Sequence, residues 1–300
     1  MRPLKRSLKR PLKRLKMRIE AYAKVNFTLE VLGKRADGYH ALRSLVVPVC
    51  LTDTLTLVDA EDISSDTGYD DDLCVKAAKI LKANASEPKT IKGVAISVEK
   101  RIPAGGGLGG GSADAAATLV ALNEMWGLRF TPERLAEIGA EVGSDVPSLV
   151  LSRFFGPVIM EGRGEFVRPA GGDFPRLNLV LVNPGVFSST PRVFSRCNSR
   201  VTDDPEILYN VISSYQSRDL SAIAASFMND LEAAAMELSP EIKTAKEALI
   251  DRGVFGALMS GSGSTVFGLV PSEDEGRKIA SSLRAEGYSA WCVETYCPVV

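Results

Sequence analysis

Histidine and paired cysteines are almost missing from this sequence. His40 is the one histidine among 300 residues, and the five cysteines are scattered without a Cys-x-x-Cys pair. Structural zinc sites and disulfide frameworks need several such residues at characteristic spacings. The sequence therefore indicates neither a disulfide framework nor a zinc site, and no histidine-based metal centre is expected.

Long apolar runs are absent as well. No run reaches the roughly 18 residues of a membrane-spanning helix, and no secretory signal pattern is present. The chain is 45% hydrophobic and 24% charged, which is typical of a globular protein. Its length suits one large domain or two of moderate size. We expect a cytoplasmic protein that does not act on membranes.

Acidic residues are missing from residues 1–16, where eight of the 36 basic residues lie. The rest of the chain holds 28 basic and 37 acidic residues, a net charge of −9. A basic arm could bind nucleic acid or an anionic membrane. The arm nearly repeats itself and is followed by Met17, which favours an extension or a start set too early. We expect no nucleic-acid partner apart from an effect of this arm.

Glycine, by contrast, is concentrated in one place. The run is Gly105, Gly106, Gly107, Leu108, Gly109, Gly110, Gly111 and Ser112. It follows a strand pattern at residues 90–100 and precedes an alanine-rich helix pattern that ends at Trp126. Glycine-rich turns before a helix let backbone amides converge on phosphate groups. The run predicts a triphosphate-binding loop, since a flexible linker does not normally join a clean strand to a clean helix.

Two other phosphate loops fit this stretch poorly. A Walker loop ends in Gly-Lys-Ser/Thr, and no lysine stands between Gly111 and Ser112. The dinucleotide fingerprint is matched by Gly105, Gly107 and Gly110, but six glycines in seven positions satisfy many patterns by accident. Pro103 also interrupts the strand-to-loop junction, and no acidic residue ends a strand about 20 positions later. A nicotinamide cofactor is therefore disfavoured.

Lys24 and Asn26 lie two positions apart in the strand pattern of residues 18–32, so their side chains share one face. A charged lysine that faces inward needs an anionic partner, whereas one in solvent needs none. From these residues alone, a solvated Lys24 is the favoured interpretation.

Tyr39 and His40 follow an Asp-Gly turn between two strand patterns. They offer an aromatic face and a ring with donor and acceptor nitrogens. The pair could hold a nucleobase, although such a pair in a hairpin usually serves packing.

Asp145 lies between Gly143, which ends a predicted helix, and Pro147. An unpaired carboxylate is costly in this apolar setting, so it caps a turn or takes part in catalysis. On its own the turn role is favoured.

A second small-residue stretch, residues 260–264, is typical of a hairpin turn and could also let backbone approach a ligand.

The remaining periodicities predict an α+β chain with a domain boundary at residues 170–176. Further strands are expected at residues 42–49, 54–58, 149–155, 158–161, 165–168, 177–182, 256–259, before 270, and at 289–294. Helices are expected at residues 70–84, 112–126 with Ser112 as cap, 131–143, 205–215, 218–236, 240–251, and after the capping box of Ser272 and Glu275.

Taken together, these pieces resemble the GHMP kinase superfamily. The shared motifs are residues 23–26, 35–40, 100–112, 143–147, 184–186 with 190–191, 229–232 and 260–264. The resemblance covers essentially residues 17–300. It implies a two-domain α+β GHMP kinase fold after a basic extension at residues 1–16. A ribosomal-protein-S5-like ATP-binding domain would span residues 17–170, and a ferredoxin-like domain residues 171–300.

The resemblance also implies an activity. The Asp-Gly-Tyr-His turn separates this chain from the homoserine, mevalonate and galactose kinases of the superfamily. It implies ATP- and Mg²⁺-dependent phosphorylation of the 2-hydroxyl of cytidine diphosphate methylerythritol, in the non-mevalonate route to isoprenoid precursors. Asp145 would be the catalytic aspartate and Lys24 the lysine paired with it, which would hold the carboxylate ionised.

Other roles follow from the same resemblance. The ATP-binding residues would be Lys100, Pro103, Gly105, Gly106, Gly107, Leu108, Gly109, Gly110, Gly111 and Ser112, with Ser112 near Mg²⁺ and no firm protein ligand of the metal. Tyr39 would stack on the cytosine, Phe194 would cover its other face, and His40 would hydrogen-bond to it. Asn26 and Thr190 would contact the polyol, and Gly261 and Gly263 would lie at the substrate.

Alternatives within and outside this class stay open. The chain could be a homoserine- or mevalonate-type kinase, or a GHMP-fold protein that binds ligand without catalysis. The joint presence of Lys24, Asp145 and an intact glycine loop argues against the latter. The chain departs from the family pattern at Asp72 and at residues 187–189. We expect a monomer or a weak homodimer.

Overall fold

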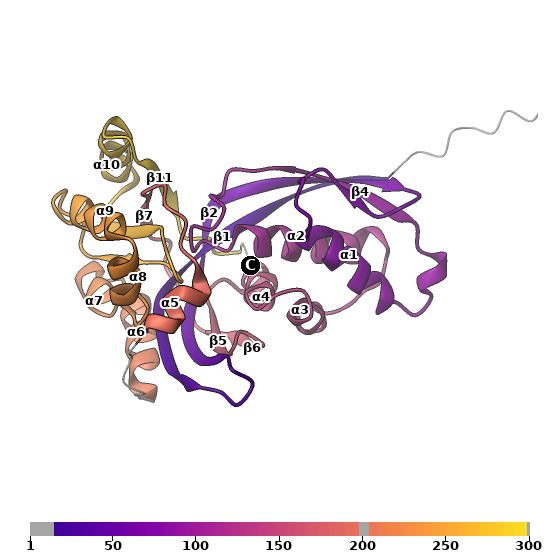
Figure 1. Ribbon diagram of the computed structural model, residues 1–300, viewed down its shortest axis with the longest axis horizontal. Coiled ribbons are helices and arrows are strands. Elements are labelled where there is room, and N and C mark those ends of the chain that lie inside the picture. The colour runs from indigo at the N-terminus through magenta and orange to yellow at the C-terminus, as the bar shows by residue number, and fades with distance from the viewer. Residues whose placement is uncertain (1–14, 198–203, 299–300) are drawn as a thin grey trace, which may run out of the picture.

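The chain forms two lobes joined by a long hairpin. The computed structural model describes residues 15–197 and 204–298. The hairpin strands are β1 (Lys16–Lys34) and β2 (His40–Ala60), which belong to the purple lobe and extend to the base of the orange one (Figure 1). The other strands of their sheet are β3 (Ser64–Ser65), β4 (Gly93–Glu99), β5 (Val158–Gly162), β6 (Phe166–Pro169) and β8 (Met228–Asn229).

β2 is the centre of this larger sheet, because it pairs antiparallel with β1, β4 and β5. The strands expected at residues 42–49 and 54–58 are one strand, so that prediction was wrong. The register with β1 shifts by two residues at Cys50 and Leu51. A bulge bends a strand without ending it, and the polar residues 52–54 that follow this one look like a turn in the sequence.

Helices α1 to α4 cover one face of the larger sheet (Figure 1). They are α1 (Leu73–Ala83), α2 (Gly110–Met125), α3 (Pro132–Ala140) and α4 (Val146–Phe155), and a short 3₁₀ helix spans Pro88–Thr90. Small alanine side chains let α2 lie close against β1, and most of this helix is buried. We expected Ser112 to cap α2, but it does not. The N-cap is Gly109, whose φ of 72° a residue with a side chain rarely adopts.

The strand expected at residues 149–155 is the helix α4, and this prediction was wrong. Its residues from Val146 to Ser152 are all buried. A helix that is apolar on all sides has the same short apolar run as a buried strand, so periodicity could not separate the two. Pro147 in the first turn of α4 was the available signal for a helix start.

The smaller sheet has the strand order β11-β7-β10-β9 and is antiparallel throughout. Its strands are β7 (Asn178–Asn183), β9 (Ala257–Met259), β10 (Val266–Val270) and β11 (Ser289–Glu294). The helices of this half are α5 (Thr190–Arg196), α6 (Pro205–Ser217), α7 (Leu220–Ala225), α8 (Glu232–Leu238), α9 (Pro240–Ile250) and α10 (Glu273–Ala285). Helices α9 and α10 pack directly on this sheet.

The single helix expected at residues 218–236 is in fact α7, β8 and α8. The short strand β8 pairs parallel with β1 at Thr28 and Leu29, and the Asp230 carboxylate accepts a hydrogen bond from the Val31 amide at 2.7 Å. These partners lie about 200 residues away in the chain, so local propensity could not reveal them. The second half thus adds a strand to the sheet of the first. The boundary expected at residues 170–176 falls between β6 and β7 and stays a prediction.

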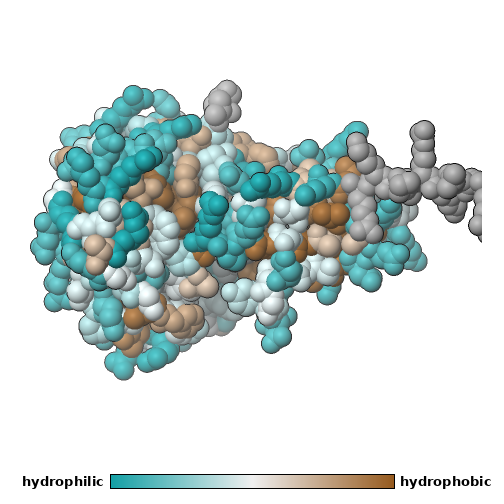
Figure 2. Space-filling view, turned by 90° about the horizontal axis from the view of Figure 1, so that it is seen from above, coloured by the Kyte–Doolittle hydropathy of each residue, from teal (hydrophilic) through white to brown (hydrophobic). Residues whose placement is uncertain are grey.

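The surface seen in Figure 2 mixes hydrophilic side chains with smaller groups of hydrophobic ones. Within the described part of the chain, no helix has both the length and the apolar character to cross a bilayer.

Phe27 joins the cores of the two halves. Its fully buried ring lies 5.1 Å from that of Tyr215, 4.9 Å from that of Phe227 and 5.7 Å from that of Phe267, measured between centroids. Phe27 belongs to the first half, whereas its three partners belong to the second.

We therefore predict that Phe27→Ala lowers the free energy of unfolding by about 3–5 kcal/mol, since it leaves a large cavity. Phe166→Ala is the control, because that side chain is 65% exposed, and it should change stability by less than about 0.5 kcal/mol. Urea unfolding followed by circular dichroism measures both. Equal losses for the two variants would contradict this role for Phe27.

Candidate active site

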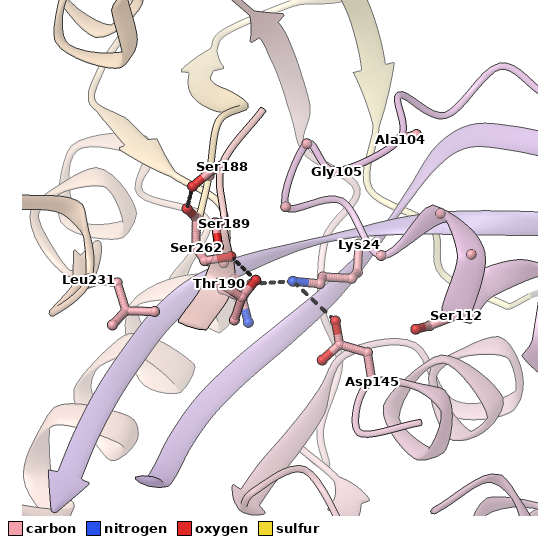
Figure 3. A pocket seen from close by; sticks show the side chains of 18 of the residues that line it. Lys24, Ala104, Gly105, Ser112, Asp145, Ser188, Ser189, Thr190, Leu231 and Ser262 are labelled. Carbon is pink, nitrogen blue, oxygen red and sulfur yellow. Dashed lines mark hydrogen bonds and ion pairs between the residues drawn. The ribbon is translucent and has the colours of Figure 1, made fainter. Parts of the chain in front are cut away.

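Two glycine-containing loops, one from each half, touch each other and line a cavity of about 490 Å³. One is the glycine-rich loop at residues 105–112, and the other is the loop at residues 260–264 between β9 and β10. Lys24, Asn26, Asp145 and Thr190 complete the lining (Figure 3). The structure therefore brings together residues spread over more than 230 positions of the sequence.

The glycine-rich loop is held through its carbonyl groups. The Gly106 carbonyl accepts from the Thr265 amide, the Gly107 carbonyl from the Ser260 hydroxyl, and the Leu108 carbonyl from the Lys24 amide, each at 3.0 Å. Within residues 15–197 and 204–298, the backbone amides of residues 105–111 donate no hydrogen bond to a protein group. The loop therefore presents unpaired amides beside the N-terminus of α2, an arrangement suited to anions.

Glycine is required where the two loops touch. Gly107 has a φ of 76°, and a methyl group there would clash with the Ser260 carbonyl oxygen. Gly261 has a φ of 58°, and a methyl group there would lie 3.1 Å from the Lys24 Nζ. Gly263, the other glycine expected at the substrate, also lines the cavity.

Lys24 is buried, with 4% of its surface exposed, so the solvated interpretation was wrong. Gly109 of the first half packs against the Lys24 side chain, and Gly261 of the second half lies beside its Nζ. Its Nζ donates to the Asn26 Oδ1 at 2.7 Å and lies 3.8 Å from the Asp145 Oδ2 (Figure 3). Burial lowers the pKa of Lys24, and the Asp145 carboxylate opposes that shift. The anionic partner that an inward lysine needs is therefore present.

Asn26 is fixed in turn. Its Nδ2 donates to the Ser44 Oγ on β2 at 2.7 Å, and that hydroxyl donates to the Thr28 carbonyl at 2.5 Å. This chain of hydrogen bonds orients the Asn26 Oδ1 toward the Lys24 ammonium and limits the positions that the lysine can take.

Asp145 occupies the N-cap position of α4, but its side chain makes no capping hydrogen bond. The side chain is 36% exposed and faces the cavity. In Figure 3 its carboxylate lies between Lys24 and Ser112. The helix start at Pro147 holds its backbone, and the carboxylate is thereby left for Lys24 and a ligand.

A second cavity of about 480 Å³ adjoins the first. The residues that line both are Leu42, Asp145, Met160, Thr190, Pro191 and Phe194. Tyr39 and His40 lie on the wall of the second cavity alone. Asp145 therefore faces both spaces.

The aromatic residues of the second cavity are arranged in two groups. The His40 and Phe194 rings stack at 5.1 Å between centroids, so His40 covers one face of Phe194. Tyr39 is 55% exposed, and the Arg163 guanidinium lies 5.4 Å from its ring centroid. Lys34 also lines this space. The sequence analysis missed Arg163 and Lys34, because single basic residues in turns are usually solvated.

Thr190 begins α5, a helix that the sequence analysis did not predict. The Thr190 and Ser262 hydroxyls lie 2.7 Å apart, and the Ser188 hydroxyl donates to the Ser262 carbonyl at 2.5 Å. These contacts connect the residue 187–189 segment to the second loop. The sequence analysis did not name Ser188 or Ser262 as site residues. The departure from the family pattern at residues 187–189 was an available signal for this part of the site.

Lys100 does not line the main cavity, whereas Pro103 does. The Lys100 ammonium lies 2.5 Å from an Asp53 oxygen and 2.6 Å from an Asp114 oxygen. It borders a smaller cavity of about 370 Å³ beside Gly105, Gly111 and Asp72. Asp72, the other departure from the pattern, caps α1 by accepting from the amides of Cys74 and Val75.

A metal ion would have few protein ligands here. Within the described residues, no group of three or more His, Cys, Asp and Glu side chains could hold one. Oxygen atoms suit Mg²⁺, and the cavity offers the Asp145 carboxylate and the Ser112 hydroxyl. These two oxygens fit a metal that is held mainly by the phosphates of a nucleotide.

Two family models match this chain. The model of the GHMP kinases N terminal domain matches residues 72–153, and that of the GHMP kinases C terminal matches residues 212–289. Together they span more than half of the chain and include the glycine-rich loop, Asp145 and the second loop. The fold and the site thus define the class of protein: this chain is a GHMP kinase family member.

Full-length relatives narrow the class. The chain is 40% identical to the 4-diphosphocytidyl-2-C-methyl-D-erythritol kinase of Geobacter sp. strain M21 over 290 residues, which cover 93% of this chain and 99% of the relative. A crystal structure of a 4-(cytidine 5'-diphospho)-2C-methyl-D-erythritol kinase matches with a TM-score of 0.78 and 32% identity, over 94% of this chain and 100% of that one. Within the GHMP kinases, the chain therefore belongs to the 4-diphosphocytidyl-2-C-methyl-D-erythritol kinase family.

The fold itself is wider than this family. The Methanococcus jannaschii mevalonate kinase matches with a TM-score of 0.70 at 16% identity, over 94% of this chain and 99% of that one. The two-domain α+β GHMP kinase fold expected from the sequence is confirmed by these comparisons.

We predict that Gly107→Ala abolishes nucleotide binding, because the methyl group would push the glycine-rich loop away from Ser260. Gly171→Ala is the matched control. Gly171 has a similar φ of 73° but open space around it. Both variants should lose about 1–2 kcal/mol of stability from the left-handed conformation. Isothermal titration with ADP distinguishes them, and equal ADP affinities would contradict the assigned contact.

Proposed function

We propose that the chain transfers the γ-phosphoryl group of ATP to the 2-hydroxyl of 4-diphosphocytidyl-2-C-methyl-D-erythritol, giving its 2-phosphate and ADP. The observation that carries this proposal is the position of Asp145, whose carboxylate faces both cavities and lies 3.8 Å from the Lys24 ammonium. A phosphoryl donor in one cavity and an alcohol in the other would meet at this carboxylate.

The triphosphate belongs on the side of the glycine-rich loop. Unpaired amides of residues 105–111 and the N-terminus of α2 supply positive potential without a side-chain charge. Pro103 lines the same cavity at the entrance of the loop. The terminal phosphate would then lie near Lys24 and Asp145.

Asp145 is the group that accepts or orients the proton of the acceptor hydroxyl. Phosphoryl transfer depends on positioning and charge stabilisation more than on a strong base. The Lys24 ammonium lies 3.8 Å from the carboxylate and adds positive charge beside the transferred group. Asn26, held by Ser44, prevents Lys24 from moving away during the reaction.

Mg²⁺ would accompany ATP and neutralise charge on its phosphates. Ser112 and Asp145 are the protein oxygens that fit it in the main cavity. This chain's own contribution is to hold those two oxygens in place, on α2 and at the start of α4.

The cytidine end of the acceptor belongs in the second cavity. Tyr39 offers an exposed ring for stacking, and the His40–Phe194 pair forms the opposite wall with hydrogen-bonding nitrogens at its edge. The polyol would then reach Thr190 and Asn26 between the cavities. Gly261 and Gly263 would let the second loop approach it closely, and Lys34 and Arg163 supply positive charge for the diphosphate.

An ADP-release assay tests the reaction. We expect turnover with 4-diphosphocytidyl-2-C-methyl-D-erythritol and none with homoserine or mevalonate, since neither has a base for the second cavity. Asp145→Asn should lower kcat by about 100-fold or more while leaving ADP affinity within about twofold. Turnover of mevalonate or homoserine alone would reject the substrate. Near-normal turnover by Asp145→Asn would reject the role of the carboxylate.

The aromatic wall gives a separate prediction. Tyr39→Ala should raise the KM for the cytidine substrate about tenfold, because base stacking on an aromatic ring is worth about 1–3 kcal/mol. The KM for ATP should not change, since Tyr39 does not line the main cavity. Tyr209→Ala removes an equally large ring that is 72% exposed on α6 and serves as the control. An unchanged KM for the cytidine substrate in Tyr39→Ala would contradict the proposed stacking contact.

A further inference from the structure

Asp53 is a fully buried carboxylate on β2 that the reaction described above does not use. Its Oδ1 accepts from the amides of Arg101 and Ile102, the latter at 2.8 Å, and its Oδ2 accepts from the Lys100 ammonium at 2.5 Å. A buried charge is tolerated only when it is paired and hydrogen-bonded. All three donors come from the segment between β4 and the glycine-rich loop, so Asp53 holds the entrance of that loop.

The exit of the loop is held by the same group. Lys100 also contacts an Asp114 oxygen at 2.6 Å, and Asp114 lies in the second turn of α2. Burial raises the pKa of Asp114 to about 7, while Lys100 opposes that rise. Gly110, the first residue of α2, packs so closely that a methyl group on it would lie 3.0 Å from the Ile102 side chain. The three charged residues therefore connect the strand before the loop with the helix after it.

We propose that Asp53 is a positioning residue for ATP, which acts with Lys100 and Asp114 to fix both ends of the glycine-rich loop. This inference rests on the proposed function of that loop. Asp53 touches neither cavity and is not a catalytic residue. Its effect is exerted through the backbone of residues 101 and 102.

The physical reason lies in the composition of the loop. Six glycines leave the unbound loop with large backbone entropy, which binding would have to overcome. A loop whose ends are already fixed loses less entropy when its amides close on phosphate groups. Loss of Asp53 should therefore weaken nucleotide binding more than it slows the chemical step.

Three variants separate this role from a merely structural one. Asp53→Leu removes the ion pair and both amide contacts, and should raise the Kd for ADP about tenfold or more. Asp53→Asn keeps an oxygen for the two amides and should raise it by a smaller factor. Lys100→Met should also raise the Kd for ADP. Asp53→Asn should raise this Kd by a smaller factor in the Lys100→Met variant than in the wild-type chain. For each, the KM for ATP should rise while the KM for the cytidine substrate stays constant.

Leu283→Ala is the control for lost stability. Leu283 is fully buried on α10 in the other lobe, so its truncation destabilises the protein without touching the loop. Its Kd for ADP should remain that of the wild-type chain. If Asp53→Leu does not fold, Asp53→Asn and Lys100→Met carry the test.

The outcomes are distinct. An unchanged Kd for ADP in both Asp53→Asn and Lys100→Met overturns the proposal. A raised Kd in Lys100→Met alone overturns it as well, because Lys100 would then contact the nucleotide directly. An equal rise of the Kd for ADP in Leu283→Ala would show that the effect comes from lost stability, and this result would also overturn the proposal. ADP binding is measured without the acceptor, so a wrong cytidine substrate would not alter these results.

Discussion

The contact between the Lys24 ammonium and the Asp145 carboxylate is the interaction on which the rest of the structure depends. Lys24 is buried between Gly109 of the first half and Gly261 of the second, and burial alone would favour its neutral form. The carboxylate, 3.8 Å away, and the Asn26 amide oxygen compensate for that cost. Each of the three residues comes from the first half, and the second half adds Gly261 beside the Lys24 Nζ.

The two glycine-containing loops extend this arrangement to a ligand. They touch where the Ser260 hydroxyl donates to the Gly107 carbonyl, and a methyl group on Gly107 would clash with the Ser260 carbonyl oxygen. The carbonyl groups of the first loop are used to hold it, and its amides are left for an anion. At the base of the loop, the buried Asp53 carboxylate likewise binds backbone, because it accepts from the amides of Arg101 and Ile102. Preorganised dipoles of this kind are worth most where water is excluded.

Local patterns predicted most of the architecture, and the failures have more than one physical origin. The alternation in β1, the capping box of α10 and the proline at the start of α3 are signals within a few residues, and each led to a correct element. The failures are α4, which is apolar on every side, and β8, which exists because β1 lies beside it. For α4 the periodicity was ambiguous, whereas for β8 a partner about 200 positions away decided the conformation. Ser112 failed as a cap for a local reason, since glycine at residue 109 allowed the helix to start earlier.

The glycine run between strand and helix was enough to predict an anion-binding loop, because its meaning is local, and the motifs indicated the family. The sequence also named Lys24, Asp145, Tyr39, His40, Thr190 and Phe194, but on their residue types alone it could not distinguish them from solvated, capping or packing residues. The folded chain was needed to learn that Lys24 is buried, that Asp145 faces two cavities, and that Lys100 is bound to Asp53 and Asp114. Burial and ion pairing depend on what covers a side chain, and here the covering residues lie up to two hundred positions away.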